Sequence, residues 1–346
     1  MRARHLAIVG LALVAAVGAI AGKVMKGDEV AAREERPAIT KSFGQKIDLV
    51  TTPIPLNSKD PSVKSVGKLD YLAGWTLKAE HWQFGGYSTL LIDPSPRGAF
   101  RFRSLSDKGL WLEAFFDPSN EAAPFTDPAI IWQRPRPDVM ALSDKTADSE
   151  SVVRAPLGYL VGYEGLHRIE YISEPGGTSW WPDRMKKLDF SGVSDNGGLE
   201  AVAWMQDRTR LLAFIENGLD TEGRLRAFLI GPTETERLYF RPPLNYSPTD
   251  AATMPNGDIL VLMRRFNQMD GIGAKLVRIR AATIRPGATM EGEELATFVP
   301  PLAVDNMEGL DIGTDEAGNT IVYMISDDNL NFLQRTILLV FRLRED

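Results

Sequence analysis

Acidic and other polar side chains recur at corresponding points in several segments of this sequence. Each segment begins with a polar residue and a short apolar run and then turns at Asp, Asn or Gly. A second apolar run follows and ends at a charged residue. The leading polar residues are Ser88, Glu200, Asp250 and Glu308. The closing charged residues are Asp107, Glu216, Arg264 and Asp327, the last followed by Asp328. Glu164, in YEGLHRIEYI, marks a fifth and shorter copy, so the pattern predicts a repeated structural unit.

Carboxylates gathered in this number have a definite chemistry. Several of them around a narrow channel cannot all stay ionised unless a cation neutralises them or some take up protons. Ca²⁺ accepts oxygen ligands in flexible geometry and suits carboxylates mixed with backbone carbonyls. The 346 residues include three histidines and no cysteine, which disfavours a zinc site built from nitrogen and sulfur. The sequence therefore predicts a site for a hard cation, with calcium as the expected ion.

Short apolar runs separated by turn residues must position these side chains. From about Val66 onward the runs are roughly five to eight residues long and bounded by Gly, Pro, Asn or Asp. No long amphipathic helix is found beyond the N-terminal segment. The copies lie roughly 45 to 60 residues apart in places, which is close to the length of a propeller blade with insertions. An all-β fold, a β-propeller of about six blades, is therefore expected.

Equivalent positions in a propeller form rings around its axis, because the innermost strand of every blade lies along the central channel. One such ring is expected to contain Ser88, Glu164, Glu200, Asp250 and Glu308. A second shell at the ends of the following strands is expected to contain Asp107, Glu216, Arg264 and Asp328. The terminal segment RTILLVFRL is expected to pair with an N-terminal strand, with QKIDLV (residues 45–50) as the candidate, and so to close the ring.

The chain is expected to divide into three parts. Residues 1–21 place Arg2 and Arg4 before an apolar stretch of about 16 residues that ends on an A-x-A cleavage signal. Residues 22–65 are polar and are interpreted as a linker followed by one entering strand, and residues 66–346 as the propeller domain. The leader predicts a periplasmic or secreted protein. An uncleaved membrane anchor is the alternative, since Lys23 and Lys26 follow it directly.

Composition narrows the classes of partner. The formal net charge is −7, which argues against a general nucleic-acid binder and suits cation binding. Without cysteine, an exported chain must be stabilised by its core or by a metal instead of by disulfides. We expect a monomer that acts on a small molecule and meets a membrane only if the N-terminal segment stays uncleaved.

Several motifs together resemble a known family. They are GGYSTLLID, LSDKG, NGGLEAVAW, PNGDILVLMRRF, NMEGLDI and ISDDNLNFLQRTILLVFRL. In these motifs the chain is similar to the phytase-like family, described as having esterase-like activity of phytase, whose members are exported bacterial β-propellers. The resemblance covers roughly residues 66–343, and the last motif is the most specific. It implies hydrolysis of phosphate or carboxylic esters.

The expected chemistry is metal-assisted ester hydrolysis. The expected metal ligands are Glu164, Glu200, Asp250 and Glu308. Arg264 or Arg265 would stabilise developing negative charge, since a guanidinium matches phosphate oxygens at two points, and Asp107 or Asp328 would serve as general base. Ser88, Arg265 and Glu216 are the expected substrate-binding residues.

Two alternatives stay open at the level of the sequence. The acids could fasten blades to one another by accepting backbone N–H bonds. The protein could also be a non-catalytic propeller that binds a partner or small ligand, with its cation only holding the fold. Other hydrolase classes are disfavoured because the sequence contains no G-x-S-x-G, H-E-x-x-H or P-loop motif.

Overall fold

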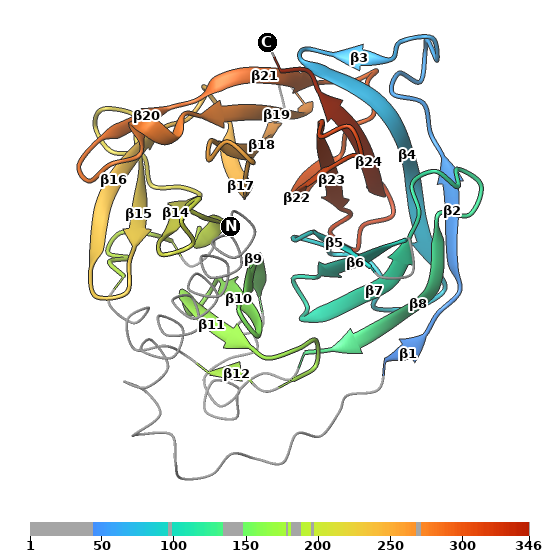
Figure 1. The fold of residues 1–346 in the computed structure, drawn as a ribbon, viewed down its shortest axis with the longest axis horizontal. Helices are drawn as coiled ribbons and strands as arrows, with labels where there is room; N and C mark the ends of the chain where they lie inside the picture. Colours follow the sequence, from blue (N-terminus) through green and yellow to red (C-terminus); the bar gives the residue numbers. More distant parts are fainter. Residues whose placement is uncertain are drawn as a thin grey trace, which may run out of the picture. The chain divides into compact units, whose positions relative to one another are not determined.

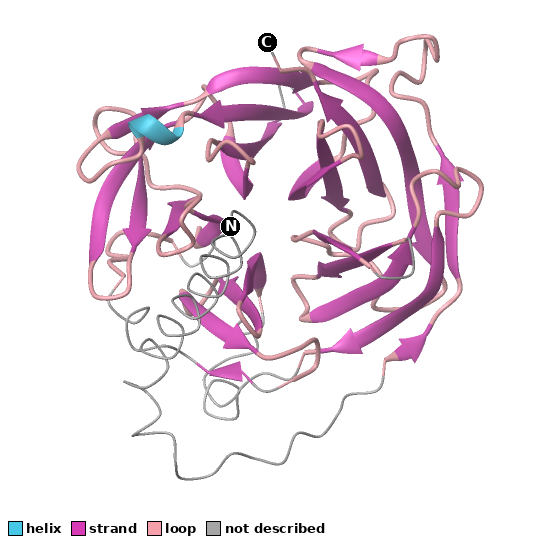
Figure 2. Ribbon diagram, in the orientation of Figure 1, coloured by secondary structure: helices cyan, strands magenta, loops and turns pink. Residues whose placement is uncertain are grey.

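The computed structural model describes residues 44–95, 99–133, 148–177, 179–180, 188–194, 197–267 and 271–345. All of them belong to one compact unit, Lys41–Asp346. The predicted leader and residues 22–43 of the predicted linker lie outside the described residues. Within the described part of the chain, no helix is long and apolar enough to cross a membrane. Regular helix there is confined to one short 3₁₀ turn, η3 (Ala281–Thr283), and the rest of the regular structure is strand (Figure 2).

The strands form five separate antiparallel sheets, numbered 1 to 5 in the order of their innermost strands. From the innermost strand outward, sheet 1 contains β5 (Leu91–Pro94), β6 (Phe100–Leu105), β7 (Leu110–Phe116), β8 (Phe125–Trp132) and β1 (Gln45–Lys46). Sheet 2 contains β9 (Ser149–Ala155), β10 (Gly158–Tyr163), β11 (Arg168–Ile172) and β12 (Ser179–Trp180). Sheet 3 contains β13 (Leu199–Trp204), β14 (Leu211–Ile215), β15 (Leu225–Ile230), β16 (Thr235–Arg241) and, added in parallel, β20 (Thr289–Glu291).

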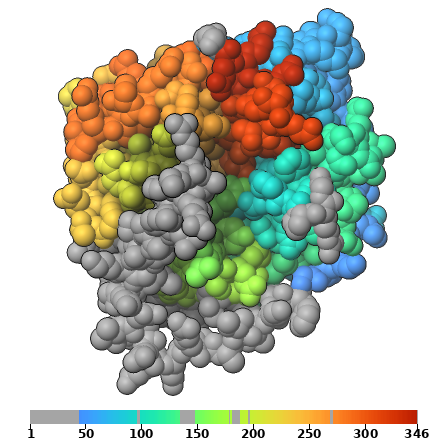
Figure 3. Space-filling model, viewed as in Figure 1, coloured from blue at the N-terminus to red at the C-terminus, as the bar shows by residue number. Residues whose placement is uncertain are grey.

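The last two sheets follow in the same order. Sheet 4 contains β17 (Ser247–Thr253), β18 (Ile259–Asn267), β19 (Gly271–Ile279) and β21 (Glu293–Phe298). Sheet 5 contains β22 (Asn306–Thr314), β23 (Thr320–Asp327), β24 (Thr336–Leu343), β4 (Leu69–Ala79) and β2 (Leu49–Pro53), with β3 (Ser65–Val66) attached to β4. The sheets follow one another around a common axis with β5, β9, β17 and β22 nearest the centre (Figure 1). The same order of sectors is visible on the surface in Figure 3. The all-β propeller class is thus confirmed.

Two features of the expected ring are wrong. The structure has five sheets instead of about six, and the ring that they form is not closed. The innermost strands pack side by side from β9 through β13 and β17 to β22, and β22 also contacts β5. Sheets 1 and 2 meet through the smallest of the core clusters. The innermost strands begin at residues 91, 149, 199, 247 and 306, so successive sheets start 48 to 59 residues apart, in agreement with the spacing of the repeats, and residues 45–343 accommodate five such sheets.

The expected pairing of chain ends also differs in its partner. The C-terminal strand β24 pairs with β4, and residues 45–50 are divided between β1 in sheet 1 and β2 in sheet 5. The reason is burial: β4 contributes the fully buried Trp75 and the nearly buried Leu77, whereas β2 is largely exposed. A strand with a continuous apolar face removes more apolar surface from water when it joins the centre of a sheet, and this burial favours the pairing.

Close packing between sheets brings the innermost strands together at Gly309 of β22. A Cβ atom there would lie 2.5 Å from Ile325 Cγ2 and 2.7 Å from the carbonyl carbon of Thr89, at the approach of sheet 5 to sheet 1. Gly313, further along the same strand, would place its Cβ 3.4 Å from the nearest atom of Tyr323, which is ordinary contact.

Gly309→Ala should therefore lower the free energy of unfolding by about 1–3 kcal/mol, because the buried Ile325 side chain and the backbone at Thr89 must both move to admit the methyl group. Gly313→Ala is the matched control, with an expected effect within about 0.5 kcal/mol. Urea denaturation of both variants measures the difference. Equal stability of the two variants would contradict the close approach of β22 to sheet 1.

Candidate metal centre

The innermost hairpin of each sheet carries one extra residue at the same place. In sheet 2, Glu150 lies between Ser149, which pairs with Tyr163, and Ser151, which pairs with Gly162, so Glu150 has no partner on β10. A β-bulge of this kind re-aims a side chain and is frequent beside functional sites. The corresponding residues in sheets 1 to 5, termed the bulge residues, are Ser88, Glu150, Glu200, Thr249 and Glu308.

A second set of equivalent positions lies beside the bulges. In each hairpin, the residue pair just before the bulge, such as Ser149 with Tyr163, is followed on the second strand by one further residue. The side chains of these further residues point to the same end of the channel. These strand-end residues are Asp107, Glu164, Glu216, Arg264 and Asp327. The backbone binds them alike: the N–H of Asp107 donates to Gly86 O at 2.8 Å, and the N–H of Glu164 donates to Asp148 O at 2.8 Å.

Two groups of three carboxylates converge here, and all of their members except Asp148 are bulge or strand-end residues. Asp148, Glu150 and Glu164 each offer an oxygen within 4.8 Å of the others, and so do Glu164, Glu200 and Glu216. Glu164 belongs to both groups, and it also accepts the N–H of Gly198 at 3.1 Å, which joins sheet 2 to sheet 3. We refer to these five residues as the acid cluster.

The acid cluster is largely shielded from water. Glu150, Glu164 and Glu200 are 9%, 7% and 4% exposed. Burial raises the pKa of Glu150 and of Glu200 well above the usual glutamate value, and neighbouring carboxylates raise both further. Burial likewise raises the pKa of Asp148 and Glu216. Desolvation and mutual repulsion therefore oppose full ionisation of the cluster unless a cation neutralises it.

Two further bulge and strand-end acids extend the charged region into sheet 5. Burial raises the pKa of Glu308 to about 7 even though Arg264 and Asn306 favour its charged form. Burial, followed by repulsion from Glu308, raises the pKa of Asp327 to about 8. Burial also raises the pKa of Asp107, despite a contact at 2.9 Å with the Nζ of Lys108.

Arg264 is the one strand-end residue that carries positive charge. Its Nη2 donates to Glu216 Oε1 at 3.1 Å, its Nη1 donates to Asn306 Oδ1 at 3.2 Å, and its Nε lies 3.5 Å from Glu308 Oε1. About a third of its side chain remains exposed, at 31%. The guanidinium group therefore stands at the edge of the acidic region, where a ligand that enters from solvent can meet it.

The donor set fits a hard divalent cation. Three carboxylate oxygens within 4.8 Å of one another match the spacing of ligands around an ion whose metal–oxygen distances are about 2.0–2.6 Å. Two buried oxygens nearby, Ser88 Oγ and Asp107 Oδ1, have no hydrogen-bond partner among the described residues. Asp107 approaches the backbone closely at Gly86, whose φ of +66° suits glycine and whose added Cβ would lie 2.3 Å from Asp107 Oδ1.

A large cavity adjoins the acid cluster through Glu216. It encloses about 780 Å³ and is lined also by Leu219, Leu244, Tyr246 and Phe266. Leu219, Leu244 and Phe266 are well exposed for apolar residues, at 58%, 86% and 75%. Carboxylates and an apolar surface therefore meet at the same mouth of the channel.

Most of the residues singled out from the sequence are brought together. Glu164, Glu200 and Glu216 belong to the acid cluster, and Glu308 and Arg264 interact beside it. Ser88 occupies the bulge position of sheet 1, and Asp107 the strand-end position.

Three residues occupy other places than expected. Thr249, not Asp250, is the bulge residue of sheet 4, and the Asp250 carboxylate instead accepts the N–H groups of Ala251 at 2.8 Å and Leu310 at 2.7 Å. The neighbour of Arg264, Arg265, faces the other side of β18 because side chains alternate along a strand, and its guanidinium lies 5.1 Å from the Tyr246 ring. Asp328 accepts hydrogen bonds from the N–H groups of Gly86 and Leu330, each at 3.0 Å, and from the Thr336 hydroxyl.

Sequence reasoning missed Asp148, Glu150 and Asn306, and gave Asp328 the position that Asp327 holds. A usable signal was present in DSESVVRAPLGYLVGYEG, where Glu150 leads an apolar run and Glu164 closes the next one. From the sequence, Glu164 is interpreted as the residue that leads the first strand of a repeat. In the structure it follows the second strand, so the prediction places it one strand too early.

Comparisons with known proteins bear on the fold and family. A family model described as phytase-like, esterase-like activity of phytase, matches residues 82–330. No curated protein matches the chain. An endo-arabinase from Bacteroides thetaiotaomicron is similar in structure, with 10% identity, a TM-score of 0.46, and coverage of 77% of this chain and 96% of that chain. An alpha-L-arabinofuranosidase from Podospora anserina in complex with cellotriose has 11% identity, a TM-score of 0.44, and coverage of 80% and 97%. These structural likenesses are too distant to bear on activity.

The stability of the metal-free protein should fall as the pH rises from about 5 to 8. Glu308 and Asp327, with raised pKa values of about 7 and 8, stabilise the fold in their protonated forms, and this contribution is lost as the pH rises through those values. Glu293, whose pKa is lowered to about 2 chiefly by its hydrogen bond with Arg278, stays ionised throughout. Thermal unfolding in chelator should show a decrease in Tm of several degrees. Glu308→Gln should flatten the profile, and an unchanged slope in that variant would contradict the assignment.

Calcium should raise the Tm of the protein near neutral pH, because the cation binds the folded carboxylates and not the unfolded chain. Glu200→Gln should weaken binding by roughly tenfold or more, since one charged ligand is lost, while the metal-free variant becomes no less stable. Glu294→Gln, on the outer strand β21, is the matched control. Calorimetric titration measures both affinities. Equal affinity in the two variants would place the cation elsewhere.

Proposed function

This chain belongs to the phytase-like family, and from that premise we propose that it is a calcium-dependent hydrolase of phosphate or other esters. The observation that carries the proposal is the convergence of five carboxylates beside one partly exposed arginine. Carboxylates alone would repel an anionic substrate. A cation together with Arg264 would reverse the sign of the local field and give negative oxygens two places to bind.

The proposed cation ligands come from the acid cluster. Glu164 is the central ligand because its oxygens lie within reach of both carboxylate groups. Asp148 and Glu150 would complete one side, and Glu200 and Glu216 the other. When bound, the cation would polarise an ester or phosphoryl oxygen and lower the pKa of a water molecule.

Arg264 would hold the substrate's oxygens and stabilise the negative charge that develops on them. Its contacts with Glu216, Asn306 and Glu308 fix the orientation of the guanidinium before the substrate arrives. Such preorganised donors typically account for about 10²–10³ in rate. Asp107 is the proposed proton acceptor, since it is partly exposed and one of its oxygens has no hydrogen-bond partner among the described residues.

The organic part of the ester would lie in the adjoining cavity of about 780 Å³. Leu219, Leu244 and Phe266 would contact it while Glu216 faces the reacting group. This placement favours a small-molecule ester with an apolar alcohol or acyl group. The proposed location is the periplasm or the cell exterior, in line with the predicted leader in residues 1–21. The proposed active form is a monomer.

The second candidate is a non-catalytic propeller in which the cation only stabilises the fold. It is favoured by the contact between the Glu164 carboxylate and the N–H of Gly198, which joins two sheets without any substrate. In this case the Arg264 guanidinium would serve only to neutralise Glu216 and Glu308.

Turnover of p-nitrophenyl phosphate and p-nitrophenyl acetate by the calcium-loaded full chain separates the candidates. Arg264→Gln should lower kcat/KM by about 10²-fold, while calcium binds as well or more tightly because a positive charge has been removed. Arg265→Gln is the matched control: it removes the adjacent positive charge on the other face of β18, and its rate should stay within about twofold. Calcium binding without turnover of either ester would favour the non-catalytic candidate.

A further inference from the structure

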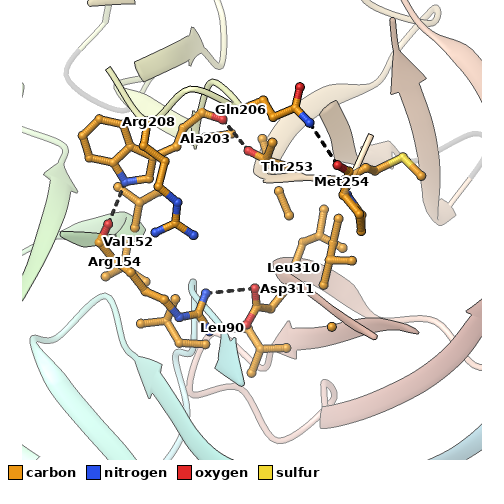
Figure 4. Close-up of a pocket in the computed structure, with 18 of the residues that line it drawn as sticks. Leu90, Val152, Arg154, Ala203, Gln206, Arg208, Thr253, Met254, Leu310 and Asp311 are labelled. Carbon is orange, nitrogen blue, oxygen red and sulfur yellow. Dashed lines mark hydrogen bonds and ion pairs between the residues drawn. The ribbon is translucent and has the colours of Figure 1, made fainter. Parts of the chain in front are cut away.

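A second cavity opens at the other end of the innermost strands. It encloses about 380 Å³, and segments of all five sheets line it, among them Leu90, Val152, Ala203, Thr253 and Leu310 (Figure 4). Glu150 of the acid cluster and Arg154 of this cavity are four residues apart on β9, which is roughly 13 Å along the strand. The cavity is therefore separate from the candidate metal centre, and the proposed hydrolysis does not involve it.

Hydrogen bonds between neighbouring sheets hold the walls of this cavity in place. The indole N–H of Trp204 donates to Arg154 O at 2.6 Å, which joins sheet 3 to sheet 2. The Gln206 amide donates to Pro255 O at 3.1 Å, and the Thr253 hydroxyl donates to Trp204 O, so sheets 3 and 4 are joined as well. A cavity whose walls are fixed in this way is already formed before a ligand arrives.

Two arginines give this cavity its charge. The Arg154 guanidinium is bound by acids: its Nη2 donates to Asp311 Oδ2 at 2.6 Å, its Nη1 donates to Asp311 Oδ1 at 3.2 Å, and its Nε donates to Asp93. Arg208 differs, because among the described residues no hydrogen bond or ion pair engages its guanidinium. Both guanidinium groups point into the cavity (Figure 4). Among the described residues that line the cavity, Asp311 is the one acid, so the lining carries an excess of positive charge in a protein of net charge −7.

The backbone at Arg208 would suit glycine better than arginine. Arg208 has φ of +54°, and its N–H donates to Met205 O at 2.8 Å in the turn between β13 and β14. The same turn position in sheet 4 is Gly257, with φ of +90°, and in sheet 5 it is Gly318, with φ of +83°. A left-handed conformation is unfavourable for a residue with a Cβ atom. Arginine therefore occupies a place where the backbone favours glycine, and its side chain is the feature that distinguishes this turn.

We propose that this cavity binds a small molecule that carries an oxyanion, a carboxylate or a phosphoryl group, on an apolar body. The Arg208 guanidinium would take the oxyanion through paired N–H donors, a geometry that matches both groups. Arg154, held by Asp311 and Asp93, would orient its remaining donors toward the same oxyanion. The apolar body would lie against Leu90, Val152, Ala203 and Leu310, on the walls of the cavity.

Calorimetric titration of the full chain in chelator, with phenylphosphonate and methylphosphonate as non-hydrolysable probes, tests this assignment. The chelator keeps cations from drawing the probes to the acid cluster. Phenylphosphonate should bind at one site and at least about fivefold more tightly than methylphosphonate, because its ring replaces water on the apolar walls. Absence of binding by both probes, or equal affinity for the two, would overturn the proposal.

Variants at the two mouths of the channel show which of them binds phenylphosphonate. Arg208→Gly suits the turn conformation, so the protein should keep its stability while the affinity for phenylphosphonate falls at least tenfold. Arg210→Gln, which removes a positive charge from the same hairpin outside the cavity, should change the affinity by less than twofold. Loss of affinity in Arg264→Gln instead of Arg208→Gly would assign the probe to the acidic mouth and overturn the proposal. Because no ester turnover is measured, the outcome is independent of the proposed hydrolysis.

Discussion

The burial of many like charges at one mouth of a channel is the constraint on which the rest of this structure depends. Glu150, Glu200, Glu308 and Asp327 are all nearly inaccessible to water, and their pKa values are raised by desolvation before any neighbour is considered. Such an arrangement persists only if the surrounding packing holds it. Apolar clusters between neighbouring sheets provide that packing, and without a cation the carboxylates must retain protons.

Pseudo-symmetry gives the channel equivalent positions, and the side chains at those positions make it asymmetric. Sheets 2 and 3 place glutamate at both the bulge and strand-end positions. Sheet 4 places Thr249 and Arg264 there, and sheet 1 places Ser88 and Asp107. Sheet 5 places Glu308 and Asp327 there, so the Arg264 guanidinium stands between the acids of sheets 3 and 5. A cation and an anionic group could then bind side by side, which is the arrangement that metal-assisted ester chemistry needs.

The two mouths of the channel have opposite character although the same strands form both. Each innermost strand begins near the acidic mouth and ends near the cavity of Arg154 and Arg208. Interactions between sheets differ accordingly. At the acidic mouth the Glu164 carboxylate accepts the N–H of Gly198, and at the other mouth the side chains of Trp204 and Gln206 donate to backbone carbonyls. Ligands of opposite charge are therefore expected at the two ends.

The sequence by itself determined the class of fold and the kinds of side chain at its centre. Short apolar runs with turn residues between them predict strands, and repeated polar positions predict that Glu200, Glu308 and Ser88 are equivalent. These inferences succeed because strand patterns and repeats are local properties of the chain.

Only the tertiary structure decided the register and the number of sheets. A bulge inserts one residue without any local signal, so Thr249 and not Asp250 takes the ring position, and Glu150 instead of Glu164. Pairing partners distant in the chain are set by total burial, which is why β24 joins β4 and not residues 45–50. Because side chains alternate along a strand, a shift of one residue decides which of two neighbouring arginines faces the acids, and no local pattern contains that information.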